Sequence, residues 1–269
     1  MDQEYNFAYL LKRCSYENCK DLRFCIARLE AGRRALADAN PEDGLADWLC
    51  FSYLHDVWVG ESSDACDNSH DVALLVWEGG VRPDGAPERT WRKLENLKSA
   101  MIALGFRGDA PPALSVDIVC MAHRLVMKGL LDAPGDFRTR HAAPVGYATT
   151  YTSPRLIARS LARLIESTND AVRVCSSATD ALRIAVVFLE RFLFVHPFVN
   201  GNGRVARLLM HVLLHRFMPV PFTVAPGSRS EYLDALDDAH RHMNYDRLSQ
   251  IVLQSAASQS ARVEWMTNN

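Results

Sequence analysis

The chain has 269 residues, of which 48% are hydrophobic and 23% charged, and its formal net charge is −2. This composition is typical of a globular protein with a sizeable core, in one large or two small domains, and excludes a strongly basic nucleic-acid or membrane-surface protein. The acidic start lacks the basic and apolar regions of a signal peptide, and no run is apolar enough to cross a bilayer. We therefore expect a cytoplasmic protein that binds neither nucleic acid nor membrane, with delivery into another cell left open.

Most of the sequence has the apolar spacing of amphipathic helices. Helices are predicted over 21–39, 42–59, 69–78, 88–104, 115–131, 153–166, 178–195, 203–217, 229–240 and 245–255. No alternation of strands and helices is visible, so the sequence disfavours a parallel-sheet nucleotide fold and predicts an all-α fold. The exception is the stretch 141–152, whose glycine, threonines and tyrosines suit a small β-hairpin.

Two patterns that could hold a metal ion are weak. The seven cysteines are scattered without a C-x-x-C pair, and Cys14, Cys19 and Cys25 have no histidine among them, so free thiols are expected. His211 and His215 have the i,i+4 spacing of a zinc site, but the glutamate of an H-E-x-x-H motif is missing and leucines surround them. We interpret both patterns as core packing.

The stretch 196–207, HPFVNGNGRVAR, separates two strongly apolar predicted helices. Its glycines allow backbone N–H groups to converge on an anion, and the next helix adds its positive N-terminal end. Arg204 and Arg207 lie three apart and project from the first turn of that helix. His196 is the nearby side chain whose ordinary pKa suits proton transfer at neutral pH. The pattern predicts a phosphate-binding loop beside a base.

This stretch resembles the signature of the Fic family, H-x-F-x-[D/E]-G-N-G-R-x-x-R. The matching residues are His196, Phe198, Gly201, Asn202, Gly203, Arg204 and Arg207. The likeness extends over roughly 45–253, because 121–138 resembles the family segment that leads into a β-hairpin flap and 228–240 resembles the helix after the motif. The resemblance implies a Fic-fold helical bundle with a small flap.

The resemblance also implies transfer of AMP from ATP to a Ser, Thr or Tyr hydroxyl of a target protein. His196 would be the catalytic base. The nucleotide-binding residues would be Gly201, Asn202, Gly203, Arg204, Arg207 and Tyr232. The target would dock along the flap at 141–153, and a homodimer is a further option because family members often dimerise.

One motif position departs from the family. Asn200 stands where the family has the Asp or Glu that holds Mg²⁺, and a neutral amide oxygen should bind Mg²⁺, or Mn²⁺ in its place, more weakly than a carboxylate does. Three alternatives follow: a slower adenylyltransferase, an enzyme of the same fold with another donor or with reverse, AMP-removing activity, and a pseudoenzyme that binds nucleotide or protein. The retained base and arginines favour the first.

The domain division also follows from the resemblance. We expect an N-terminal helical region at 1–80, a Fic domain at 81–256 and a C-terminal tail at 257–269. Many family members carry an inhibitory [S/T]-x-x-x-E-[G/N] helix, and a degenerate version at about 56–66 would place Asp64 in the inhibitory role. Glu264, in the stretch 260–265, is a rival candidate for that role.

Overall fold

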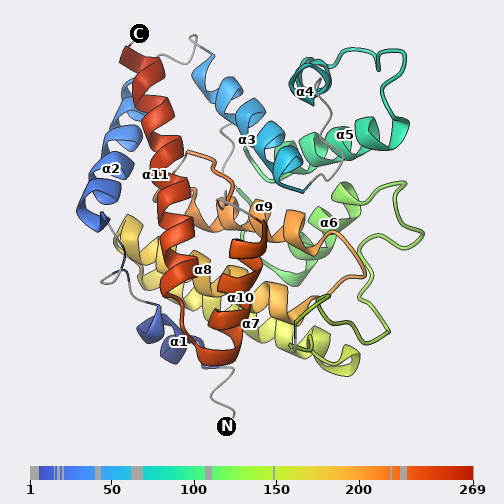
Figure 1. Ribbon diagram of the computed structural model, residues 1–269, viewed down its shortest axis with the longest axis vertical. Helices are drawn as coiled ribbons and strands as arrows, with labels where there is room; N and C mark the ends of the chain where they lie inside the picture. Colours follow the sequence, from blue (N-terminus) through green and yellow to red (C-terminus); the bar gives the residue numbers. More distant parts are fainter. Residues whose placement is uncertain are drawn as a thin grey trace.

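The computed structural model describes residues 6–14, 16, 19, 21–39, 44–61, 69–106, 111–147, 149–218, 220–224 and 229–268. Within these ranges the regular structure is helical (Figure 1), which confirms the predicted all-α class. The helices are α1 (Phe7–Arg13), α2 (Leu22–Asp38), α3 (Leu45–Glu61), α4 (Ser69–Glu78), α5 (Glu88–Ala103), α6 (Val116–Val126), a 3₁₀ turn (Pro154–Leu156), α7 (Ile157–Val174), α8 (Ala178–Val195), α9 (Asn202–Leu214), α10 (Arg229–His242) and α11 (Asp246–Asn268).

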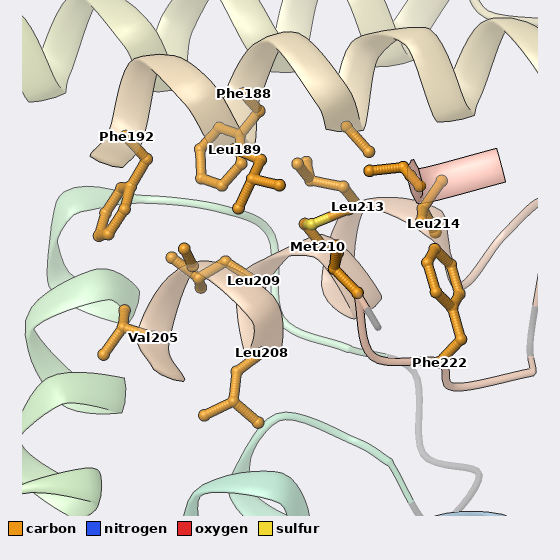
Figure 2. Close-up of a cluster of buried hydrophobic side chains, with 14 of the residues drawn as sticks. Phe188, Leu189, Phe192, Val205, Leu208, Leu209, Met210, Leu213, Leu214 and Phe222 are labelled. Atoms are coloured by element: carbon orange, nitrogen blue, oxygen red, sulfur yellow. The ribbon is translucent and has the colours of Figure 1, made fainter. Parts of the chain in front are cut away.

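Helix α8 is the centre of the bundle. It is apolar on nearly all sides, and a helix of that kind must be buried on all sides. It packs against α1, α7, α9, α10 and α11. Figure 2 shows its side chains Phe188, Leu189 and Phe192 facing those of α9, including Val205 and Leu209. This contact fixes the two helices on either side of the 196–201 loop.

Helices α2 and α11 pack along each other through small side chains. A Cβ atom added to Gly32 would lie 2.6 Å from the Cβ of Ser260, so only glycine permits this approach. The predicted helix at 245–255 therefore continues to Asn268, and the expected boundary at 256/257 falls inside α11. The serines and alanines of this stretch show no clear apolar periodicity in the sequence. Their small side chains nevertheless pack closely against a glycine-containing partner helix.

Two other helix ends lie five or more residues from the predicted position. Helix α6 ends at Val126 instead of 131, because Met127 caps it and Gly129 adopts a left-handed φ of 66°. Helix α7 continues past 166 to Val174. Its polar residues there suggested a helix end, but the Thr168 hydroxyl donates to the Leu164 carbonyl within the helix at 2.7 Å and is buried.

The predictions about metals and membranes can be compared with the described residues. The six cysteines among them are free thiols, and no group of three or more His, Cys, Asp and Glu side chains gathers there as a metal site. His211 is buried against the ring of Phe106, as expected of a core residue, and burial lowers its pKa to about 3. No described helix combines the length and hydropathy that a bilayer-spanning segment needs.

Candidate active site

The loop between α8 and α9 is a short turn in which two residues have left-handed backbone conformations. His196 caps the C-terminus of α8 with φ 46° and ψ 59°, and its N–H donates to the Phe192 carbonyl at 2.9 Å. Gly201 caps the N-terminus of α9 with φ 82°. The left-handed φ favours glycine here, and a Cβ atom at Gly201 would also lie 2.8 Å from Sδ of Met127, which would have to move. The predicted helix–loop–helix is confirmed.

The imidazole of His196 is held in one orientation and one tautomer. Its Nδ1 lies 3.1 Å from the Leu193 carbonyl oxygen, which can only accept, so Nδ1 carries the proton at neutral pH. Nε2 then has a free lone pair and can act as a base. The ring stacks on Tyr151 with centroids 3.9 Å apart and an interplanar angle of 3°. Burial, with a smaller contribution from the positive charge of Arg138, lowers the pKa of His196 to about 4.

This low pKa predicts an unusual pH dependence. A base must be unprotonated to act, so its contribution is complete above its pKa and is lost only as the pH falls through that value. Because the pKa of His196 lies near 4 and not at its ordinary 6.5, we expect kcat/KM to stay flat from neutral pH down to about pH 5 and to fall below it. A pH profile of initial rates, with circular dichroism at each pH to show that the chain stays folded, measures this. A fall centred near pH 6.5 would contradict it.

His123 fixes the loop from the opposite side. Its Nδ1 accepts the Gly135 N–H at 2.7 Å, so the proton is on Nε2, which donates to the Asn200 carbonyl at 2.9 Å. The ring is 1% exposed and stacks on Phe198 with centroids 3.7 Å apart. The sequence offered no signal for this role, because His123 lies 77 positions from Asn200 and looks like any histidine on an apolar helix face.

The side chain of Asn202 closes the loop from within. Its Oδ1 accepts the Phe198 N–H at 3.0 Å and its Nδ2 donates to the Phe198 carbonyl at 2.8 Å. We expected this amide to help hold phosphates. With its oxygen and one N–H used in the loop, the backbone N–H of Asn202, in the first turn of α9, is the group better placed to face an anion.

Arg138 connects the helix end to the segment that follows α6. It is 4% exposed, and its guanidinium donates to the carbonyls of His196 at 2.7 Å and Arg140 at 2.8 Å. It also donates to the carbonyls of Thr152 and, at 3.4 Å, Val195. A positive charge at the C-terminus of α8 is favourable, and the donors satisfy carbonyls that the helix leaves without partners. Sequence reasoning noted Arg138 only as part of a segment.

The expected hairpin at 141–153 is not observed: the described residues of this stretch, 141–147 and 149–153, contain no strand. One backbone bond crosses it, from Tyr151 N–H to the Ala142 carbonyl at 3.2 Å, while Thr152 N–H donates to Phe194 of α8. Two of its side chains bond outside the segment: the Tyr147 hydroxyl donates to Asp234 at 2.9 Å and the Thr149 hydroxyl to Asp237 at 2.6 Å, both on α10. The segment is therefore held by α8 and α10.

A cavity of about 520 Å³ opens at the 196–201 loop. It is walled by α3, α5, α8, α9, α10 and the 141–153 segment. It brings together the predicted site residues His196, Asn200, Gly201, Asn202, Gly203, Arg204, Arg207 and Tyr232. Asp64 lies outside the described residues. The rival inhibitory residue, Glu264, does not line the cavity and forms an ion pair with Arg28 of α2.

The described lining residues of the cavity do not offer a Mg²⁺ site of the expected kind. The Asn200 Oδ1 accepts the Gly201 N–H at 2.6 Å, and it is a neutral oxygen. The acidic side chains among the lining residues are Glu190 and Asp237, on α8 and α10. Glu190 is buried in an ion pair with Arg191, and Asp237 accepts the Thr149 hydroxyl. Since Mg²⁺ is usually held by at least one carboxylate beside the substrate phosphates, these residues do not fit it.

Residues 113–214 match the Fic/DOC family. The chain is similar to a Fido domain-containing protein of Dictyostelium discoideum, with 28% identity over 137 residues that make up 49% of this chain and 92% of that protein. It is 30% identical over 131 residues to the protein adenylyltransferase fic-1 of Caenorhabditis briggsae, covering 47% of this chain and 24% of that protein. The chain thus spans about a quarter of the length of that adenylyltransferase.

Solved structures share the fold at lower identity. A Fic domain-containing signaling protein from Bacteroides thetaiotaomicron matches with a TM-score of 0.74 and 18% identity, over 91% of this chain and 98% of that one. BepC from Bartonella tribocorum, with bound AMPPNP, matches with a TM-score of 0.50 and 17% identity over 65% and 91% of the two chains. IbpAFic2 tethered to Cdc42 matches with a TM-score of 0.51 and 16% identity over 78% and 70%. Residues 113–214, which contain the α8–α9 loop and His196, form a Fic/DOC family domain.

Proposed function

We propose that this chain is a protein adenylyltransferase, which moves AMP from ATP to a Ser, Thr or Tyr hydroxyl of a target protein. The observation that carries the proposal is the oriented imidazole of His196, with an unprotonated Nε2, at the edge of a cavity that also contains Arg204 and Arg207. A relative is named as a protein adenylyltransferase, and a structure of the same fold binds an ATP analogue.

The reaction assigns a task to each of these groups. The target hydroxyl oxygen attacks the α-phosphorus of ATP, the bond from that phosphorus to the β-bridging oxygen breaks, and pyrophosphate leaves. Nε2 of His196 takes the hydroxyl proton as the new bond forms. The first-turn backbone N–H groups at Gly201–Gly203 bind phosphate oxygens, and Arg204 and Arg207 stabilise the charge that builds on the leaving pyrophosphate.

The remaining predicted groups bind the two substrates. Tyr232, on the α10 wall of the cavity, would contact the adenine. The target would dock along 141–153, where a hairpin flap would form if an extended peptide paired with this segment, since pairing supplies the partner that a lone strand lacks. A structure of the same fold is tethered to a protein, Cdc42, which supports a protein target. The proposal also allows the chain to form a homodimer.

Labelled ATP tests the function directly. The full chain is incubated with ATP labelled on the α-phosphate or on the γ-phosphate, with candidate targets and with itself as acceptor. Adenylyl transfer predicts protein-bound label from α-labelled ATP and none from γ-labelled ATP. Label from the γ-phosphate would instead show phosphoryl transfer.

One observation favours a second candidate function. Asn200 provides no carboxylate and uses its amide oxygen within the loop, which suits a chain that binds nucleotide without turning it over, or one that uses another donor or removes AMP. Saturable ATP binding with no transfer of either label would favour the nucleotide-binding pseudoenzyme. Loss of AMP from a previously adenylylated protein would favour the reverse activity.

A further inference from the structure

The cavity contains more positive charge than the signature residues supply. The basic side chains that line it are Arg89, Lys93, Arg204, Arg207 and Arg229. Two of them, Arg89 and Lys93, belong to α5, which lies before the 113–214 match and carries no motif. They are four residues apart, so they project from the same face of that helix.

These two side chains are placed toward the cavity and not toward acidic neighbours. Lys93 is half-buried, and its ammonium lies 5.4 Å from the ring centroid of Trp58, which lines the same cavity. Within the described part of the chain, neither Arg89 nor Lys93 forms an ion pair. Arg92, on another face of α5, pairs with Glu88 and does not line the cavity. Helix α5 therefore places two positive charges at the cavity, whereas the charge of Arg92, outside the cavity, is balanced by Glu88.

The acidic lining residues do not offset this charge. Glu190 is compensated by Arg191, and Asp237 forms an ion pair with Arg241 at 3.3 Å. Arg89 and Lys93 therefore add positive charge that these acidic lining residues do not offset, and a cleft lined by one sign of charge concentrates ligands of the other sign.

Among the residues that the structure describes, the cavity lining therefore combines several cations with no carboxylate placed to hold a metal ion. Given the function proposed above, we infer that Arg89 and Lys93 of α5, together with Arg204 and Arg207, neutralise the donor's triphosphate in place of a divalent metal ion. Free ATP carries roughly four negative charges at neutral pH and its Mg²⁺ complex roughly two, so a site built from fixed cations attracts the free form more strongly. Metal-free ATP then binds more tightly than MgATP.

Calorimetric titration of ATP into the full chain tests this without measuring turnover. In EDTA, ATP should bind the wild type more tightly than in excess Mg²⁺, by about threefold to tenfold. The double variant Arg89→Gln/Lys93→Gln should weaken metal-free binding by about tenfold, since each of the two lost cation–phosphate contacts near a protein surface contributes about threefold. Its binding in Mg²⁺ should change less.

The matched control removes the same charge elsewhere. Arg92→Gln/Arg159→Gln lowers the net charge by the same amount at exposed positions outside the cavity lining, and should bind ATP as the wild type does. Asn200→Asp should reverse the preference, because the new carboxylate repels free ATP and gives Mg²⁺ an anionic ligand.

The outcomes separate this inference from the proposed function. ATP binding that Mg²⁺ tightens in the wild type, or that is equal in the α5 double variant and the wild type in EDTA, overturns the inference and leaves the adenylyltransferase standing. An absence of ATP binding in both buffers overturns both.

Discussion

Replacing His196 with alanine should lower adenylyl transfer by about a thousandfold while leaving ATP binding nearly unchanged, because a positioned general base contributes about 10²–10⁴-fold to such reactions. The imidazole lies at the cavity edge and its Nε2 is the atom with the free lone pair. Its loss removes the proton acceptor but none of the phosphate-binding groups. Initial rates with α-labelled ATP, together with calorimetric ATP titration, give both quantities.

The control for this variant is another histidine. His242 is exposed in the last turn of α10 and does not line the cavity, so His242→Ala should transfer AMP at the wild-type rate. A His196→Ala variant that keeps more than about a tenth of the rate would show that another group accepts the proton. A large loss of ATP affinity would instead assign His196 to donor binding.

Replacing Arg138 with leucine should lower the free energy of unfolding by about 3 kcal/mol, the range seen when a buried, hydrogen-bonded charge is removed and its partners stay buried. The guanidinium donates to four carbonyl oxygens, which belong to the end of α8, to Arg140 just before the 141–153 segment and to Thr152 near its end. Leucine leaves these acceptors without the shared donor. Urea denaturation followed by tryptophan fluorescence measures the change.

Two comparisons sharpen this prediction. Arg138→Lys keeps the charge but not the planar fork, so it should recover only part of the stability. The side chain of Arg140 is exposed, and only its backbone carbonyl accepts a bond from Arg138. The free energy of unfolding of Arg140→Leu should therefore stay within about 0.5 kcal/mol of the wild-type value.

The Arg138 variant also has an electrostatic signature. Its positive charge contributes to the lowered pKa of His196, so the acid limb of the pH profile should move to higher pH in Arg138→Leu and not in Arg138→Lys.

The stability prediction has its own contrary outcome. If Arg138→Leu and the wild type have equal free energies of unfolding, solvent replaces the guanidinium as the donor to these carbonyls.

The sequence predicted well wherever the signal was local. The apolar run at 178–195 predicts helix α8 with the bounds that the structure has, and in the structure Ser177 caps its start, where the Ser177 hydroxyl accepts the Asp180 N–H at 3.0 Å. The polar, glycine-containing stretch after it predicts the loop, in which Gly201 adopts a left-handed φ. These features depend on neighbours within one helical turn, which is the range that periodicity and capping describe.

Prediction failed where a segment depends on distant partners. The hairpin at 141–153 was expected from composition, but most of the bonds in its described residues go to α8, α10 and Arg138. The end of α11 was missed because its small side chains become a packing surface only against Gly32 of α2.

The sequence by itself determined the candidate site of this protein: a histidine, a glycine turn and two arginines in twelve consecutive positions, set between two helices. The tertiary structure decided how those groups behave. It buries His196 and lowers its pKa, uses the amides of Asn200 and Asn202 within the loop, and adds Arg89 and Lys93 from another helix to the cavity. Residue type and spacing are properties of the local chain, whereas burial, proton affinity and net charge in a cavity are set by the segments that folding brings together.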